Sequence, residues 1–375
     1  MPEKSIFVGT SVHSWNDPRI FYKEAISMAK KYNVEIHAPA DFDFKEEQNV
    51  KIFGLPLWQR VGERRLIRKL LFKRVKESSA DVFHFHDPEL IFLGLYVKLF
   101  KKKKVIYDIH EDIYSAILLR KWIPTKFFRK AVALFYSRTE KWCCVFFDLI
   151  IFAEQYYKEL FSNKIKSKSV DILNFPLQQK KAKYKKRNDF VKVIYTGNVT
   201  ADRGAYNMIA CLRYLIQTNH KIKLFLVGQL KSEKIISMIE NDLELSKHIE
   251  LIGKRKFVDR LEINKHYENA DIGLVLISST THYERKLLTK FFEYMQHEIP
   301  MIISNFTEWE RFIAETKCGI CVDPKDPSAV GEAVEYLINN QQAAETMGKN
   351  GKKAIQEKYN WLTQEEILLA AIDSL

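Results

Sequence analysis

The sequence predicts an α/β protein made of two Rossmann-like domains, each a parallel β-sheet between layers of helices. Short apolar segments rich in β-forming residues alternate with longer segments of helical periodicity, which is typical of parallel sheets covered by helices. The alternation stops at a polar, basic segment near the middle of the chain and then restarts. The length of 375 residues also suits two domains, since a domain usually has roughly 100–200 residues.

The N-terminal half begins with an apolar strand, and we expect its sheet to end at Leu149–Phe152. Period-two and β-rich patterns predict strands at Ser5–Thr10, Val34–Ala38, Val50–Phe53, Asp81–Phe85, Lys104–Asp108 and Leu149–Phe152. Helical periodicity predicts helices at Arg19–Lys31, Arg64–Glu77, Pro88–Phe100 and Gln155–Phe161.

A polar segment without periodicity separates the two halves. Residues 178–188 are mostly Lys and Gln, so we place a linker at 177–190. The N-terminal domain then covers 1–176 and the second domain 191–358. The last segment, 359–375, is helical, and we expect it to pack back on the N-terminal domain.

The same alternation continues after the linker. Strands are predicted at Val191–Tyr195, Lys223–Val227, Ile249–Leu251, Ile272–Leu276, Met301–Ser304 and Gly319–Val322. Helices are predicted at Tyr206–Gln217, Phe291–His297, Pro327–Asn339, Ala343–Lys358 and Gln364–Leu375. Ligands of such sheets bind beyond the carboxyl ends of the strands, so we expect the site in a cleft between the two domains.

The composition narrows the class of protein and of partner. Lys and Arg number 60 against 47 Asp and Glu, a formal charge of +13, so we expect nucleic acid, an anionic membrane or a phosphorylated substrate as partner. A hydrophobic content of 46% excludes a disordered chain. Five cysteines, an odd number, argue against a disulfide framework. The sequence contains no pattern of a signal peptide or membrane span, so we expect a cytoplasmic protein.

Polar residues follow the first predicted strand. His13, Asp17 and Arg19 precede the first helix and are placed to reach a ligand. Alternatively, Asn16 or Asp17 caps that helix and Arg19 is solvated.

Two further strands end in polar residues. His86 and Asp87 follow Asp81–Phe85, with Asp87 as the expected N-cap of the next helix, and His110 and Glu111 follow Lys104–Asp108. The repetition at equivalent positions favours a binding site. A metal site is the alternative interpretation of the His-x-His-Asp segment, although its first His belongs to the strand.

In the second half, two segments favour a phosphate site. Gly197 leaves a strand, and Arg203 with Gly204 opens a helix, which suits an anion held by backbone N–H groups, a helix N-terminus and a guanidinium. Lys290 and Glu293 lie one turn apart on a later helix, where the amine suits a phosphate and the carboxylate suits ribose hydroxyls. The alternative for the latter pair is a surface ion pair.

These motifs together resemble the GT-B glycosyltransferases, specifically the large retaining group called family 4 (glycosyl transferase group 1), of the type that builds bacterial surface polysaccharides. The resemblance covers nearly the whole chain in order. It is carried by Asp17–Ile20, His84–Leu90, Tyr107–Glu111, Tyr195–Gly197 with Arg203-Gly204, Val227-Gly228, Ala270–Leu274, Lys290–Met295 and Val322–Pro324.

The resemblance implies a role for each matched residue. Arg203 and Lys290, with Gly197, would hold the diphosphate of a UDP- or GDP-linked sugar donor, so no metal cofactor is expected. Glu293 would bind the ribose, and His110 would face the donor sugar at the reaction centre. The leaving phosphate of retaining members is thought to help deprotonate the acceptor, so no enzyme nucleophile is expected.

The chain departs from the family pattern in two places. The first Glu of the E-x7-E motif falls at Arg285, and the nearest carboxylate is Glu284. The glycine-rich loop often found after the first strand is replaced by His13–Asn16. Both places lie near the donor sugar or the acceptor in relatives. We therefore assign to that end of the site His13, Asp17, Arg19, His86, Glu111, Glu284 and Arg285.

Two basic stretches, 58–76 and 118–147, mix Lys and Arg with Trp, Phe and Leu. This composition suits the interface of an anionic membrane, and the alternative is a solvated helix face over a core. We therefore expect a cytoplasmic protein peripheral at the inner face of the cell membrane.

The function predicted is sugar transfer from a nucleotide-diphosphate donor to a glycan acceptor, lipid-linked by our interpretation, in capsule, O-antigen or exopolysaccharide synthesis. A GT-B nucleotide-sugar epimerase is one alternative. A basic protein that binds nucleic acid or another polyanion is the alternative from a different class, although the sequence has no RNA-binding aromatic motif.

Overall fold

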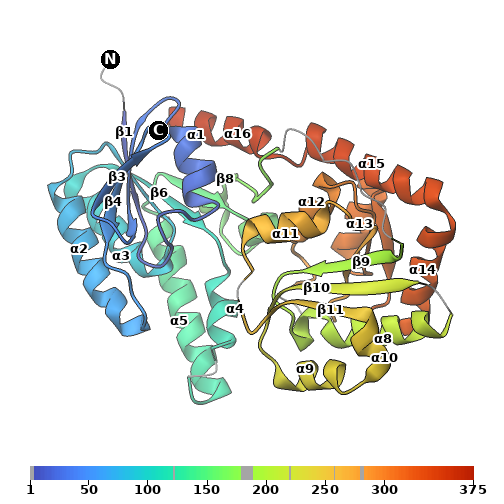
Figure 1. The fold of residues 1–375 in the computed structure, drawn as a ribbon. Coiled ribbons are helices and arrows are strands. Elements are labelled where there is room, and N and C mark those ends of the chain that lie inside the picture. Colours follow the sequence, from blue (N-terminus) through green and yellow to red (C-terminus); the bar gives the residue numbers. More distant parts are fainter. Residues whose placement is uncertain (1–3, 121–122, 179–188, 219–220, 257, 279–282) are drawn as a thin grey trace. The chain divides into compact units, whose positions relative to one another are not determined.

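The computed structural model describes residues 4–120, 123–178, 189–218, 221–256, 258–278 and 283–375. The chain divides into two compact units, Met1–Asn174 with Trp361–Leu375, and Phe175–Asn360. Each unit contains one sheet with helices around it, so the predicted fold class is confirmed (Figure 1). Most of the linker predicted at 177–190 lies outside the described residues.

The sheet of the N-terminal unit has the strand order β3-β4-β2-β1-β5-β6-β7-β8. All its pairs are parallel except β3 with β4. Its strands are β1 (Ser5–Gly9), β2 (Asn33–Pro39), β3 (Phe44–Glu47), β4 (Val50–Leu55), β5 (Val82–Phe85), β6 (Lys104–Ile109), β7 (Leu149–Phe152) and β8 (Ser169–Asp171).

Two of these strands were not predicted from the sequence, and the expectation that Leu149–Phe152 ends the sheet is wrong. β3 is polar and mostly exposed, and β8 has only three half-buried residues, so neither carries an apolar pattern. Each is recognised only through its partner strand, β4 or β7.

Helices cover both faces of this sheet, because successive side chains of a strand point to opposite faces. Phe7 packs with α2, α3 and α5, whereas Ile6 and Val8 pack with η1, α1 and α16. The helical segments are η1 (Ile20–Ala25), α1 (Ile26–Met28), η2 (Val61–Glu63), α2 (Arg64–Glu77), η3 (Pro88–Leu90), α3 (Ile91–Tyr96), η4 (Val97–Lys101), α4 (Ile113–Leu118), α5 (Lys126–Cys144), α6 (Gln155–Glu159), α7 (Asn163–Lys166) and α16 (Trp361–Asp373).

The C-terminal unit has an all-parallel sheet in the order β11-β10-β9-β12-β13-β14. Its strands are β9 (Val191–Thr196), β10 (Ile222–Leu230), β11 (Ile249–Lys254), β12 (Ile272–Val275), β13 (Met301–Ser304) and β14 (Gly319–Val322). Its helical segments are η5 (Ala201–Arg203), α8 (Ala205–Gln217), α9 (Glu233–Glu240), α10 (Leu243–His248), α11 (Arg260–Tyr267), α12 (Thr289–Gln296), α13 (Thr307–Thr316), α14 (Pro327–Asn339) and α15 (Gln341–Glu357).

The strand orders locate the expected binding edge of each sheet. In the N-terminal unit the chain moves outward from β1 in one direction and then returns to build β5 on the other side. In the C-terminal unit the same reversal occurs between β9 and β12. Ligands bind beyond the carboxyl ends of strands at such a reversal.

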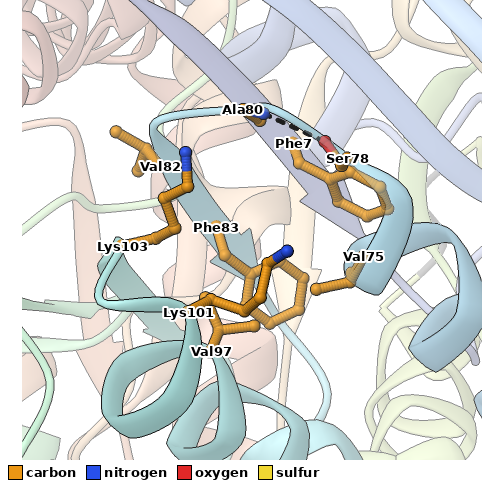
Figure 2. Close-up of a pocket in the computed structure, with 9 residues that line it drawn as sticks. All are labelled: Phe7, Val75, Ser78, Ala80, Val82, Phe83, Val97, Lys101 and Lys103. Atoms are coloured by element: carbon orange, nitrogen blue, oxygen red, sulfur yellow. Dashed lines mark hydrogen bonds between the residues drawn. The ribbon is translucent and has the colours of Figure 1, made fainter.

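The opposite edge of the N-terminal sheet holds a small pocket, lined by Phe7, Phe83 and neighbouring apolar side chains with two lysines (Figure 2). Lys101 Nζ donates to the carbonyl of Lys76, and Lys103 Nζ to that of Ser79. The lysines therefore bind the carbonyl groups of the chain at the end of α2, and this pocket needs no ligand to satisfy them.

Helix α16 returns to the N-terminal unit and is anchored there by Trp361. This side chain is 1% exposed, and its Nε1 donates to Ser27 Oγ at 2.9 Å. Leu368 and Ile372 are fully buried in the same apolar cluster as Ile6.

We predict that Trp361→Ala lowers the free energy of unfolding by about 3–5 kcal/mol, because it empties a large buried volume and removes a hydrogen bond. Urea denaturation at pH 7 measures the change. Leu362→Ala, at the next and 51% exposed position, is the matched control and should be nearly neutral. Equal effects of the two substitutions would show that α16 does not stabilise this unit.

Candidate functional site

In the N-terminal unit, the polar residues predicted from the sequence meet where β1, β5 and β6 end. The centre of the group is Arg19, whose side chain is buried. Its Nε donates to Asp108 Oδ2 at 3.0 Å, and its Nη2 donates to the same oxygen at 2.9 Å. Its Nε also lies 2.8 Å from Glu24 Oε1. The alternative that Arg19 is solvated is therefore wrong.

The local backbone explains how Arg19 and Glu24 meet. The helix predicted over Arg19–Lys31 starts with a π-helical turn, η1, in which the N–H of Glu24 donates to the carbonyl of Arg19 at 2.9 Å. This wider turn brings residues five apart onto one face, whereas a regular α-helix would place them on different sides.

The pKa values of the two carboxyl groups beside Arg19 are shifted in opposite directions. Burial, and then the negative charge of Asp108, raise the pKa of Glu24 well above its ordinary value. Burial alone would also raise the pKa of Asp108, but the Arg19 guanidinium outweighs it and lowers that pKa well below its ordinary value. Asp108 is therefore the ionised partner of Arg19, and burial disfavours the charged form of Glu24.

His110 is held by this group through one ring nitrogen. Its Nε2 lies 3.0 Å from Asp108 Oδ2, 3.1 Å from Arg19 Nε and 3.3 Å from His86 Nδ1. The ring is 18% exposed, and Tyr157 Oη donates to its backbone carbonyl at 3.1 Å. Burial lowers the pKa of His86 to about 4, so this neighbour is neutral.

His13 joins the same edge. Its ring centroid lies 5.8 Å from that of His110, and its Nδ1 lies 3.1 Å from Asp17 Oδ2. The other oxygen of Asp17 accepts from the backbone N–H groups of Arg19 and Ile20, at 2.8 and 3.1 Å. Asp17 thus binds two N–H groups at the start of η1, although Arg19 holds the N-cap position without a side-chain hydrogen bond, and the same Asp17 side chain also orients His13.

Two N-terminal predictions need correction or stay open. Asp87 stands at the N-cap position of η3, but its side chain does not cap that helix. Its Oδ2 accepts from Ser11 N at 2.6 Å and Thr10 Oγ1 at 2.8 Å, so it fastens the segment after β1. Glu111 is exposed and borders a small pocket with Glu140, and its role stays a prediction.

The side chains around Arg19 include the types that bind metal ions, namely His and carboxylate. Ligand atoms of Glu24, His86, Asp108 and His110 lie within 4.8 Å of one another. However, the Arg19 guanidinium lies 2.8–3.1 Å from three of these side chains. It already supplies the positive charge that a metal would bring, and these residues therefore do not fit a metal ion.

In the C-terminal unit, the three residues predicted to bind a diphosphate come together. Gly197 follows β9 with φ +111°, a conformation that favours glycine. A Cβ at Gly197 would lie 3.6 Å from Lys290 Nζ and 3.9 Å from an Nη of Arg203. Two cationic side chains therefore share one small space beside a bare backbone.

Lys290 is buried, and its environment is unusual for an amine. Lys290 lies in the first turn of α12 and is only 6% exposed. Its Nζ has no hydrogen-bond partner among the described residues. The ammonium lies 3.9 Å from the ring centroid of Tyr195. Burial, and then the charge of Arg203, lower the pKa of Lys290 to about 7. This environment favours an anion beside the lysine.

The backbone around Arg203 depends on a second glycine. Gly204 has φ +83°, and a Cβ there would lie 1.9 Å from the carbonyl oxygen of Leu276, just after β12. Glycine thus lets the start of α8 approach the end of β12 and brings Arg203 to the same edge as Lys290.

Glu293 lies one turn after Lys290 but pairs with other residues. Tyr267 Oη donates to Glu293 Oε2 at 2.5 Å, and Arg260 forms an ion pair with Oε1. With Lys290 buried, the alternative of a surface ion pair between Lys290 and Glu293 is wrong. Arg260 and Tyr267, both on α11, were not singled out from the sequence.

The predicted donor-sugar residues Glu284 and Arg285 lie in the turn before α12. Glu284 is half-buried and Arg285 exposed. Residues 279–282, just before them, lie outside the described part of the chain. The roles of both residues stay predictions.

The charge states around Arg19 give a paired prediction. Glu24→Gln should change the free energy of unfolding by no more than about 1 kcal/mol at pH 7, because burial disfavours the charge that this substitution removes. Asp108→Asn should lower it by about 3–5 kcal/mol, because it leaves the buried guanidinium without its ionised partner. Urea denaturation of both variants measures the difference. A larger loss for Glu24→Gln than for Asp108→Asn would contradict these charge states.

The comparisons with known proteins agree with this architecture. Residues 177–354 match the family described as glycosyl transferases group 1. The capsular polysaccharide biosynthesis glycosyltransferase CapM of Staphylococcus aureus is 26% identical over 200 residues, 53% of this chain and 50% of CapM. The matched part thus spans about half the length of that relative.

Two solved structures share the fold. Sucrose-phosphate synthase of Thermosynechococcus elongatus superposes with a TM-score of 0.72 at 13% identity, covering 99% of this chain and 98% of that one. HepE of Anabaena in complex with UDP-glucose gives a TM-score of 0.70 at 13% identity and covers both chains fully. Among the described residues, no helix is long and apolar enough to cross a membrane. Residues 177–354 are thus similar to the glycosyl transferases group 1, and the chain has the GT-B fold of these solved structures.

Proposed function

We propose that the protein transfers a sugar, with retention of configuration, from a UDP- or GDP-linked donor to a glycan acceptor. The observation that carries this proposal is the meeting of Lys290, Arg203 and Gly197 at the end of β9. Two cations that repel each other in a buried space are stabilised by an anion between them, and a diphosphate is the leaving group of a nucleotide sugar.

The same residues support a reaction without a metal ion. In glycosyl transfer, negative charge develops on the diphosphate as the bond to the sugar breaks. Lys290 and Arg203 supply two positive charges, and the start of α12 adds the partial positive charge of a helix N-terminus. We propose that these groups together stabilise the leaving diphosphate.

We further propose that Glu293 binds the ribose of the donor. Its carboxylate is 15% exposed and accepts from Tyr267 and Arg260. Ribose presents two adjacent hydroxyl groups, which would donate to the same oxygens in place of Arg260. Removal of Glu293 should therefore weaken nucleotide binding more than binding of inorganic diphosphate.

In the N-terminal unit, we propose that His110 contacts the donor sugar. The inner nitrogen is engaged by Asp108, Arg19 and His86, so the ring is oriented with its other edge outward. The protein then needs no nucleophile of its own, because the leaving phosphate accepts the proton of the acceptor hydroxyl. His13 and Asp17 would contribute to acceptor binding.

The names of the relatives support the substrate class. CapM is named for capsular polysaccharide biosynthesis, and HepE was solved with UDP-glucose. We propose that this protein acts on a lipid-linked glycan in the synthesis of a bacterial surface polysaccharide, at the inner face of the cell membrane.

A basic surface on α2 supports membrane association. Leu66 and Phe72 are 54% and 41% exposed, and Arg65, Lys69 and Lys73 are exposed beside them. Exposed apolar side chains among cations suit the boundary of an anionic membrane.

The role of Lys290 is tested by two measurements on one variant. Lys290→Met should raise the free energy of unfolding by about 1–2 kcal/mol, because it removes a buried amine that has no hydrogen-bond partner among the described residues. The same variant should lose thermal stabilisation by millimolar UDP or GDP and turnover of nucleotide sugars.

Lys192→Met is the matched control, because that buried amine donates to His266 O and Asn269 Oδ1 and should stabilise the fold. The Lys192→Met variant should be less stable than the wild type and should still bind nucleotide. If Lys290→Met bound UDP and GDP like the wild type, the diphosphate assignment would be wrong.

Membrane association gives a separate prediction. Replacing both Arg65 and Lys69 by Ala should weaken binding to anionic vesicles ~30-fold, since each cation near such a surface contributes about 1 kcal/mol. Co-sedimentation at low salt measures this, with the exposed Lys349→Ala in the C-terminal unit as control. Equal binding of wild type to neutral and anionic vesicles would contradict the electrostatic part.

A further inference from the structure

An open hollow lies on the N-terminal unit between α3 and α5. It is wide open to solvent and is lined by Phe92 of α3 and by Ala131, Leu134, Phe135, Arg138, Thr139 and Trp142 of α5. Three of its aromatic side chains are strongly exposed: Phe92 at 60%, Phe135 at 67% and Trp142 at 55%. Exposed apolar side chains gathered around one concave surface mark a binding surface.

The charges of α5 define what kind of molecule fits there. Its basic side chains are Lys126, Arg129, Lys130, Arg138 and Lys141. Arg129 donates to the carbonyls of Ile123 and Leu118, and Lys141 lies over the ring of Phe161, whereas Lys126, Lys130 and Arg138 are exposed. Its one acidic residue, Glu140, is 4% exposed and accepts from Tyr107 Oη inside the unit. The outer surface of this helix is therefore cationic as well as apolar, and it complements a molecule with an anionic head and a hydrocarbon tail.

Two other occupants fit the surface less well. In a symmetric contact between two copies of the chain, each α5 would face the same cations on its partner. A nucleic acid would satisfy the cations, but Leu134 and Ala131 offer it neither hydrogen bonds nor a flat stacking surface.

We propose that this hollow binds one acyl chain of an anionic membrane phospholipid, whose phosphate lies against Arg138 and the neighbouring cations of α5. The inference rests on the proposed membrane association and deepens it. Membrane association by charge alone would leave the lipid chains in the bilayer. Here one lipid chain leaves the bilayer and enters the hollow beside Trp142.

Trp142 is a reporter within the hollow. The full-length protein is mixed with phosphatidylglycerol vesicles whose acyl chains carry bromine, which quenches tryptophan fluorescence at contact, and with unbrominated vesicles as reference. We expect bromine-dependent quenching in the wild type and loss of its greater part in Trp142→Phe. Trp58→Phe, near the other basic helix, should retain it.

A second pair of variants tests the lining itself. Leu134→Glu places a charge in the hollow at a position that is 41% exposed, so the fold should be retained, and circular dichroism checks this. It should lose the quenching of Trp142. Leu261→Glu, at a 75% exposed position of the C-terminal unit, should behave as wild type.

Parallel co-sedimentation separates the possible outcomes. Binding to anionic vesicles without quenching that depends on Trp142 would overturn the acyl-chain site and leave the membrane proposal standing. Absence of binding to anionic vesicles would overturn both. A self-associated wild type that becomes monomeric in Leu134→Glu would show that the hollow is a contact between copies and would also overturn the inference. The inference would also be overturned if α5 bound RNA tightly and in a salt-dependent way, if Leu134→Glu left that affinity unchanged, and if brominated chains did not quench the fluorescence.

Discussion

Two cations that occupy one buried space, Lys290 and Arg203, are the constraint that organises the C-terminal unit. Burial, and then the charge of Arg203, lower the pKa of Lys290, so this proximity is unfavourable for its ammonium. The surrounding backbone maintains it nevertheless. Gly197 leaves the space open, and Gly204 permits the close approach of α8 to β12. A fold that keeps two like charges together in this way gives up stability for a binding site, which is a common property of functional sites.

The N-terminal unit treats its buried cation in the opposite way. Arg19 is paired with an ionised Asp108, lies beside Glu24 and also orients His110. The charge is therefore balanced without a ligand, and the group stabilises the ends of β1 and β6. Arg19 and Lys290 therefore show two different roles of a buried positive charge. Arg19 positions other side chains, whereas the Lys290 amine has no hydrogen-bond partner among the described residues and, in our proposal, meets an anion from outside.

Periodicity and strand-end positions predicted the fold class and most strands, because these are local signals, whereas the resemblance to family 4 glycosyltransferases implied the grouping of Gly197, Arg203 and Lys290. β3 and β8 were missed since their stability comes from strand pairing and not from an apolar pattern. The burial of Arg19 depends on Asp108, 89 positions away, and on the π-helical turn, neither of which is visible in local spacing. One signal was available: Asp108 is a charged residue inside an otherwise apolar strand, and such a residue usually has a buried partner.

The most direct measurement of the central claim is the proton balance of nucleotide binding. If the ammonium of Lys290 meets the diphosphate, its pKa rises from about 7 on binding, and the complex takes up about one proton at pH 8. Titration calorimetry of UDP and GDP in two buffers of different ionisation enthalpy measures this uptake. Lys290→Arg, which is charged at every relevant pH, should bind nucleotide without it. Nucleotide binding by the wild type with no proton uptake, or with the same uptake in Lys290→Arg, would contradict the diphosphate role of Lys290.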